Sequence, residues 1–113
     1  MHELAVTQNL VRIAVENAER HGANRIKQIN IVVGDMSSIV DDSVQFYFDI
    51  ISKGTPSEGA VLFFRRIPIE CICTECGKTF NPNPGSFECP FCQGLGMVTD
   101  SGMEFYVDSI EVD

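Results

Sequence analysis

Two stretches of the chain repeat apolar residues with the period of an α-helix. The first covers residues 4–21 and carries an apolar stripe at Val6, Leu10, Ile13 and Ala14. The second covers about residues 43–53 and has apolar side chains at Val44, Tyr47, Phe48 and Ile51. Because this spacing places the apolar side chains on one helix face, we expect two amphipathic helices. Glycines, which favour helix ends, follow both stretches.

Three other stretches have the apolar character of β-strands. They cover residues 25–34, 60–69 and 103–112. In the first of them, every second residue from Ile29 to Val33 is apolar, which indicates a strand with one buried face. In the last, the alternation changes phase after Val107, and this change predicts a β-bulge near Asp108. Residues 35–42, before the second helix, read as a polar turn that contains candidate helix caps.

The expected order is helix, strand, helix, strand, a cysteine-rich module and a final strand. The final strand has no core of its own, so we expect it to return to the first sheet. This predicts an α+β fold in which two helices cover a small sheet and the cysteine module is inserted between two strands. Residues 1–68 and 96–113 would then form one discontinuous domain, and residues 69–95 would form a zinc-ribbon domain.

Size and composition limit the alternatives. The chain has 113 residues with an ordinary hydrophobic content of 44%, which suits one domain with a small metal-stabilised module. We find no apolar run long enough to cross a membrane and no secretory signal pattern. Reduced cysteines then favour a cytoplasmic location. The net charge of −8 argues against nucleic-acid binding, which requires a basic face.

Two C-x-x-C pairs are the strongest chemical signal in the sequence. They are formed by Cys73 with Cys76 and by Cys89 with Cys92, and twelve residues separate the pairs. Such turns direct four thiolates to one point and form a closed tetrahedral shell, which is typical of structural zinc. A redox C-x-x-C occurs once, beside a βαβ pattern that is missing here. Disulfides are disfavoured because the chain has an odd number of cysteines, five, and no signal peptide.

The fifth cysteine, Cys71, has two interpretations. It is either a partly buried thiol on the strand that approaches the module, or an alternative metal ligand. We favour the buried thiol, because Cys73, Cys76, Cys89 and Cys92 form the better pair of turns.

His2 is the other candidate for metal chemistry. A histidine at position 2 brings together the α-amine of Met1, a backbone amide nitrogen and an imidazole, and the amide or carboxylate of Glu3 completes four donors. Nitrogen ligation of this kind suits Ni²⁺ or Cu²⁺ better than Zn²⁺. The alternative is that His2 belongs to a frayed terminus. His21, at the end of the first helix, has a simpler role beside the helix dipole, with ligation as the weaker alternative.

Taken together, these motifs resemble the HypA/HybF family of nickel metallochaperones, which act in [NiFe]-hydrogenase maturation. The matching features are Met1-His2-Glu3, the turn at Gly34, the segment Thr55-Pro56-Ser57-Glu58-Gly59-Ala60 and both C-x-x-C pairs. The resemblance covers essentially the whole chain. A zinc ribbon alone would be unspecific, but its combination with an N-terminal Met-His-Glu is highly specific.

The resemblance implies two metal centres. Ni²⁺ would be bound by His2 with Glu3 and the terminal amine of Met1, and structural Zn²⁺ by Cys73, Cys76, Cys89 and Cys92. It also implies two partners, a nickel-handling GTPase of the HypB type and the [NiFe]-hydrogenase large-subunit precursor, and in some organisms urease as a further client. Cys71 departs from the expected cysteine set. The chain would be a monomer or a homodimer.

Other function classes fit the sequence less well. A zinc-ribbon adaptor, in which the N-terminus is incidental, is the second hypothesis, and it should tolerate the loss of His2. A hydrolase would need an open metal position with a nearby base, whereas four cysteines close the zinc shell. We therefore expect a carrier protein and not an enzyme.

Overall fold

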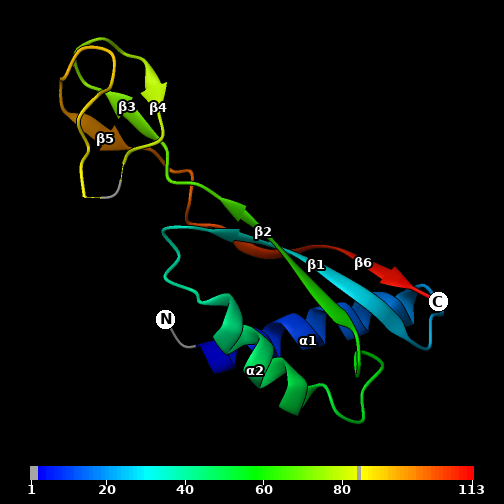
Figure 1. Cartoon of the computed structure of the whole chain (residues 1–113). Helices are drawn as coiled ribbons and strands as arrows, with labels where there is room; N and C mark the ends of the chain where they lie inside the picture. Colours follow the sequence, from blue (N-terminus) through cyan, green and yellow to red (C-terminus); the bar gives the residue numbers. More distant parts are fainter. Residues whose placement is uncertain (1–2, 84) are drawn as a thin grey trace.

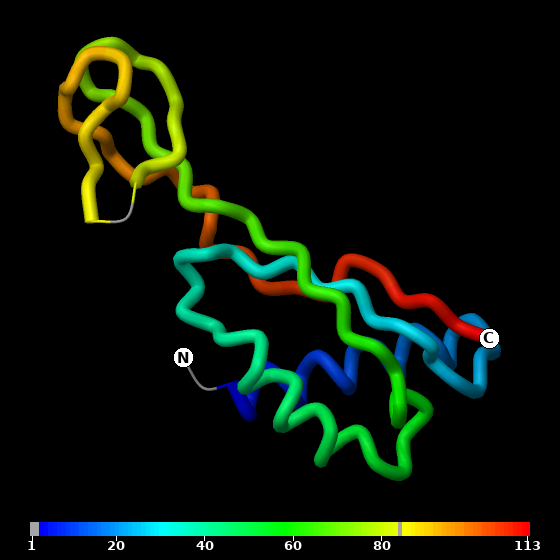
Figure 2. Tube along the Cα trace, viewed as in Figure 1, coloured from blue at the N-terminus to red at the C-terminus, as the bar shows by residue number. Residues whose placement is uncertain are grey.

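A three-stranded mixed sheet carries both helices on one face (Figure 1). The computed structural model describes residues 3–83 and 85–113. A second, smaller sheet holds the cysteines and projects from one end of the first, so the molecule is elongated, with extents of 54 × 24 × 17 Å (Figure 2). These features confirm the α+β fold class.

The larger sheet consists of β1 (Ile26–Gly34), β2 (Val61–Ile67) and β6 (Phe105–Val112) in the order β2-β1-β6. Strands β1 and β2 are parallel, because α2 carries the chain back to the start of the sheet between them. The last strand, β6, is antiparallel to β1. The final strand therefore returns to the first sheet, as the sequence predicts.

The predicted bulge at Asp108 is confirmed. Asn30 pairs with Ser109 and Ile31 pairs with Val107, so β6 has one extra residue, Asp108, at this point. The extra residue shifts the alternation of β6. As a result, both Val107 and Ile110 pack against the core between the sheet and the helices.

The helices are α1 (Glu3–Arg20) and α2 (Asp41–Ile51). Neither is long and apolar enough to cross a membrane. Residue Val40 precedes α2 as its N-cap, and no side-chain cap bond is present there. The expectation that a polar residue of the preceding turn caps α2 is therefore wrong. Val40 has no polar side-chain atom, and its extended backbone leaves the orphan N–H groups of the first turn to other partners.

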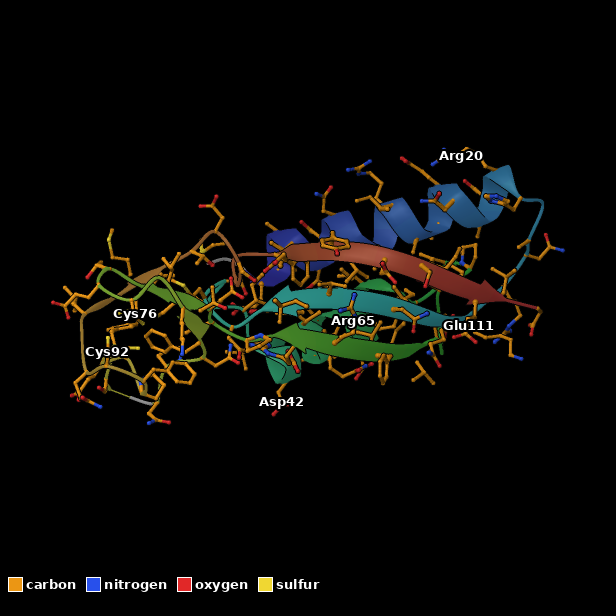
Figure 3. All side chains as sticks on the ribbon, turned by 90° about the horizontal axis from the view of Figure 1, so that it is seen from above. Arg20, Asp42, Arg65, Cys76, Cys92 and Glu111 are labelled. Atoms are coloured by element: carbon orange, nitrogen blue, oxygen red, sulfur yellow. The ribbon has the colours of Figure 1, made fainter. Side chains whose placement is uncertain are left out.

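The helices bury one continuous apolar core against the sheet. Its buried side chains include those of Leu10, Ala14, Ile29, Ile31, Val33, Val44 and Phe48. They come from the predicted apolar faces of both helices and of β1, so tertiary packing follows the sequence pattern. The opposite face of the sheet, seen from above in Figure 3, carries the exposed side chain of Arg65.

The cysteine module is built on β3 (Cys71–Cys73), β4 (Thr79–Phe80) and β5 (Gly96–Val98), which are antiparallel in the order β4-β3-β5. It is inserted between β2 and β6. Its sheet includes residues 96–98, which the sequence pattern assigns to the other domain. The division into domains remains a prediction.

Residues 94–96 connect the second C-x-x-C pair to β5. Backbone hydrogen bonds hold all three residues in place. Cys89 N–H donates to Gly94 O at 2.9 Å, Thr74 N–H to Leu95 O at 3.0 Å, and Gly96 N–H to Phe87 O at 2.8 Å. Position 96 requires a glycine for close packing, because a side chain there would collide with the ring of Phe80.

Both connections to the module pass over the turn that follows β1. Asp35 N–H donates to Ile67 O at 2.8 Å, at the end of β2. On the other side, Gly34 N–H donates to Glu104 O at 2.6 Å and Met36 N–H to Gly102 O at 2.7 Å. The turn at Gly34 therefore joins the base of the cysteine module to the larger sheet.

Candidate metal centres

The four predicted zinc ligands lie together at the tip of the module. Sγ atoms of Cys73, Cys76, Cys89 and Cys92 are all within 4.8 Å of one another. The Cys73–Cys92 sulfur distance is 3.4 Å and the Cys76–Cys89 distance is 3.7 Å. Tetrahedral metal–sulfur bonds of about 2.3 Å would separate the sulfurs by about 3.8 Å, so the donor set fits a thiophilic ion with small adjustment.

Each C-x-x-C pair forms a tight turn that presents backbone N–H groups to sulfur. The N–H groups of Glu75 and Cys76 each lie 3.4 Å from Cys73 Sγ, and Phe91 N–H lies 3.4 Å from Cys89 Sγ. These donors stabilise the thiolate form, which is the form that binds a metal.

The two turns reach the left-handed backbone region through different residue types. Gly77 has a φ of 75° in the first turn, as expected from its position after the second cysteine. In the second turn the residue with positive φ is Gln93, at 65°, and not Gly94. Gly94 serves another purpose, because a side chain there would collide with the Glu75 carboxylate and lie 3.1 Å from Cys73 Sγ.

The electrostatics of the cluster require a cation for all four sulfurs to ionise. Backbone N–H groups of Cys76 and then Glu75 lower the pKa of Cys73 to about 6. The N–H donated by Gly94 lowers the pKa of Cys92, but the contact with Cys73, burial, and the contacts with Cys76 and Cys89 together raise it to about 12. One thiol thus ionises easily, and its negative charge disfavours ionisation of its neighbours. A divalent ion removes that repulsion and completes a closed shell.

Cys71 is separate from this cluster. Its side chain is fully buried on β3, where it packs with Phe80 beneath Cys73 and Cys89. Burial, and then the charge of Glu70, raises the pKa of its thiol. Among the described residues the four-sulfur group excludes Cys71, which agrees with the interpretation as a buried thiol.

The second candidate centre is at the start of α1, and only part of it belongs to the described chain. Met1 and His2 lie outside the described residues. Glu3 is the first residue of α1, and its Oε2 accepts the backbone N–H of Val40 at 3.3 Å. The carboxylate of Glu3 therefore binds the N–H of the N-cap residue itself at the N-terminus of α2, where a negative charge is favoured by the helix dipole.

The second histidine is remote from Glu3. His21 follows α1, whose 18 residues rise by about 26 Å from first to last. Its Nδ1 lies 2.8 Å from Asn17 O, so this nitrogen is the ring donor to the last turn of the helix. Within one chain, an additional imidazole for a site at Glu3 cannot come from His21.

Sequence reasoning missed a charged cluster beside Glu3. Arg66, near the end of β2, forms ion pairs with Asp35 at 2.9 Å and with Asp41 at 2.6 Å. The pKa of Arg66 is raised, chiefly by the hydrogen bond to Asp35 and also by Asp41, against the opposing effect of burial. The partners are 31 and 25 residues away in sequence, and no local pattern indicates such pairs.

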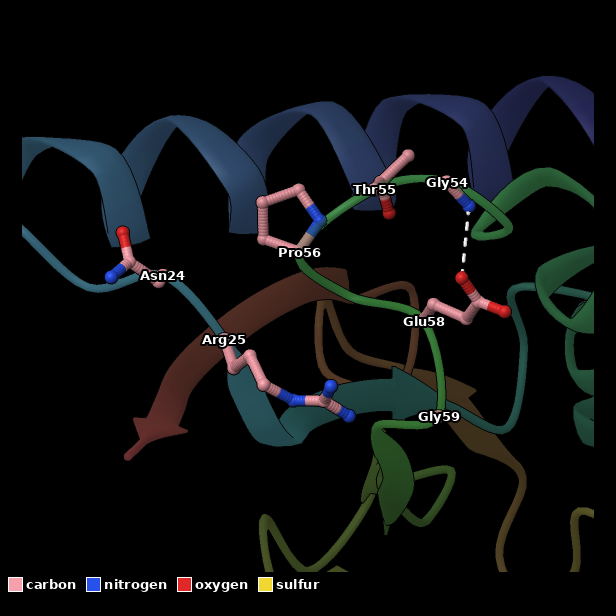
Figure 4. A pocket seen from close by; sticks show the side chains of 7 residues that line it. All are labelled: Asn24, Arg25, Gly54, Thr55, Pro56, Glu58 and Gly59. Carbon is pink, nitrogen blue, oxygen red and sulfur yellow. Dashed lines mark hydrogen bonds between the residues drawn. The ribbon is translucent and has the colours of Figure 1, made fainter.

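A hollow of about 660 Å³ lies beside the segment from Thr55 to Ala60, and Figure 4 shows the residues that line it: Asn24, Arg25, Gly54, Thr55, Pro56, Glu58 and Gly59. Its polar groups serve the loop itself. Thr55 and Ser57 share a hydrogen bond of 2.6 Å, and Glu58 Oε1 accepts the N–H of Gly54 at 3.0 Å. The described residues of this hollow include no cluster of metal ligands.

Comparison with known proteins decides the family. The family model described as "Hydrogenase/urease nickel incorporation, metallochaperone, hypA" matches residues 1–112. The chain belongs to the HypA family. The resemblance inferred from its motifs is therefore confirmed over nearly the full length of the chain.

Curated relatives agree with this assignment. The chain is 43% identical over 114 residues to a protein of Caldanaerobacter subterraneus named "Hydrogenase maturation factor HypA", with 100% of both chains covered. It is 44% identical over 113 residues to a protein of the same name from Dehalococcoides mccartyi, covering 100% of this chain and 95% of the relative.

Solved structures show the same fold at low sequence identity. The solution structure of the Ni metallochaperone HypA from Helicobacter pylori superposes with a TM-score of 0.66 and 23% identity, covering 99% of this chain and 97% of the other. A second solution structure of a HypA protein gives a TM-score of 0.69, also at 23% identity, with coverages of 99% and 96%. At this identity the comparison concerns the fold alone.

Proposed function

We propose that this chain is a nickel carrier for the maturation of [NiFe]-hydrogenase, with Ni²⁺ bound at its N-terminus and Zn²⁺ held by the four cysteines. The match of a nickel-incorporation metallochaperone family over residues 1–112 carries this proposal. Two curated relatives that align along the whole chain are named as hydrogenase maturation factors. The proposed donors are the Met1 amine, His2 and Glu3 for nickel, and Cys73, Cys76, Cys89 and Cys92 for zinc.

The start of α1 suits the nickel donors. The first N–H groups of a helix have no partner within the helix, so the amide nitrogen of Glu3 is not committed to a helical hydrogen bond. Amide, amine and imidazole nitrogens favour Ni²⁺ over harder cations. Amine and imidazole must lose protons before they bind, so nickel affinity should fall as the pH is lowered.

A carrier must also release its metal. The carboxylate of Glu3 is only partly buried, and its one hydrogen bond within the described part of the chain is with the N–H of Val40. A site with so little supporting structure exchanges ligands easily with a partner. We propose a nickel-handling GTPase of the HypB type and the hydrogenase large-subunit precursor as these partners, with urease as a further client. The protein would act in the cytoplasm and catalyse no reaction of its own.

The zinc site has a structural role in this proposal. Its four sulfurs leave no position for substrate or water, and Cys73 and Cys89 are buried in the small core of the module. The metal would therefore stabilise the module and take no part in nickel transfer chemistry.

Calorimetric titration of the untagged, zinc-loaded protein with Ni²⁺ tests the proposed function. The wild type should bind nickel, and His2→Ala should lose this binding and retain its zinc, because the imidazole is a primary ligand. The matched control is His21→Ala, which removes the other histidine at the far end of α1 and should bind nickel like the wild type. Equal nickel binding by wild type and His2→Ala would exclude the N-terminal site.

A further inference from the structure

Arg66 binds three acceptors around the N-terminus of α2. It donates to Asp35 Oδ1 at 2.9 Å, to Asp41 Oδ1 at 2.6 Å and to the backbone carbonyl of Ile39 at 3.3 Å. The planar guanidinium group can reach several acceptors in fixed directions at once. One side chain from β2 therefore connects the turn after β1 to the first residue of α2.

Two of these acceptors flank the residue that contacts Glu3. Ile39 and Asp41 lie on either side of Val40, whose backbone N–H donates to Glu3 Oε2 at 3.3 Å. Val40 has an extended backbone and its side chain is 54% exposed, so packing of that side chain does little to fix the peptide. On the α2 side, Val40 O accepts the N–H groups of Ser43 and Val44, each at 3.1 Å. The peptide that carries the Val40 N–H is held by Arg66, which donates to its carbonyl, Ile39 O, and by the buried side chain of Ile39.

We infer that Arg66 is a positioning residue for the N-terminal nickel site, acting by holding residues 39–41 in the arrangement that orients Glu3. This inference rests on the proposed function, because it concerns the same nickel site. Arg66 does not contact the metal. Residues that orient metal ligands typically change metal affinity by about 10-fold to 100-fold when they are removed.

The direction in which nickel affinity changes when Arg66 is removed distinguishes a positioning role from a purely electrostatic one. Arg66 is a cation close to a site for another cation, and it neutralises Asp35 and Asp41. If charge alone mattered, removing Arg66 would make the site more negative and strengthen nickel binding. A positioning role predicts the opposite, because loss of the ordered peptide at Val40 would leave Glu3 without its fixed partner.

The experiment compares Arg66→Gln with Arg65→Gln in the untagged, zinc-loaded full chain. Both variants lose one positive charge from neighbouring positions of β2. Arg65 is exposed and makes no ion pair among the described residues. We expect Arg66→Gln to bind Ni²⁺ about tenfold more weakly in calorimetry, and Arg65→Gln to bind it like the wild type. Arg66→Lys keeps the charge but cannot bridge all three acceptors, and should give an intermediate affinity.

A second readout does not need nickel. The amide resonance of Val40 and its hydrogen exchange report the bond to Glu3 in the nickel-free protein, and both should change in Arg66→Gln but not in Arg65→Gln. Unchanged or tighter nickel binding by Arg66→Gln, or an unchanged Val40 amide, would overturn the inference. If the wild type itself bound no nickel through His2, the proposed function would fail, and the Val40 amide would still show whether Arg66 orders this segment.

Discussion

Replacing Cys89 with serine is expected to unfold residues 71–98 and leave the larger sheet folded. The module has strands of only two or three residues, and its buried cluster consists of Cys71, Cys73, Phe80 and Cys89. Such a core is too small to compensate the conformational entropy of the module. Binding of structural zinc contributes about 10 kcal/mol or more to folding, and losing one of four thiolates removes most of it.

Amide resonances of the module and the zinc content measured by mass spectrometry check this prediction. Cys71→Ala is the matched control, because it removes another buried thiol of the module, one that lies outside the four-sulfur group. We expect this variant to keep one zinc per chain and a folded module. A folded, zinc-free Cys89→Ser module would show that packing alone sustains it, and zinc loss in Cys71→Ala would make Cys71 a ligand.

Gly34→Ala is expected to destabilise the larger sheet by at least about 3 kcal/mol, at the upper end of the cost of overpacking. A Cβ atom on Gly34 would overlap the backbone carbonyl of Gly102 and lie 2.7 Å from the backbone nitrogen of Glu104. Backbone atoms cannot rotate away as a flexible side chain can. The segment before β6 would have to move, and the hydrogen bond from Gly34 N–H to Glu104 O would be strained or lost.

Gly22→Ala separates this steric effect from the general effect of adding a methyl group to a glycine. Gly22 has a φ of 71°, and nothing lies within 4 Å of the position that the methyl group of an alanine would take there. Its substitution should cost only about 1 kcal/mol, the penalty of a left-handed backbone at a non-glycine residue. Urea unfolding of both variants gives the two values. Equal costs would contradict the close approach of backbones at Gly34.

Sequence periodicity predicted the larger elements well. Both helices and the three long strands begin and end within two residues of the expected positions. These elements are long enough for their apolar faces to repeat several times. The bulge at Asp108 was also predictable, because β6 must bury Val107 and Ile110 on the same side. The cysteine cluster followed from spacing alone, since a tetrahedral thiolate site restricts the turn geometry strongly.

Features that depend on long-range geometry were not predictable. The strands of the module are too short to show periodicity, so the backbone hydrogen bonds that Leu95 and Gly96 make with Thr74 and Phe87 could not be foreseen. The role of Arg66 was hidden for a similar reason, because its acceptors come from two other segments of the chain. The contact between Glu3 and the N–H of Val40 was likewise hidden, because it joins two helices that lie far apart in the sequence.

X-ray absorption at the nickel and zinc edges of the untagged protein, loaded with one equivalent of each metal, tests the two-centre account most directly. We expect the zinc spectrum to fit four sulfurs at about 2.3 Å and the nickel spectrum to fit only nitrogen and oxygen neighbours. Sulfur in the first shell of nickel would contradict the account, because it would place the transported metal in the cysteine module and not at the N-terminus.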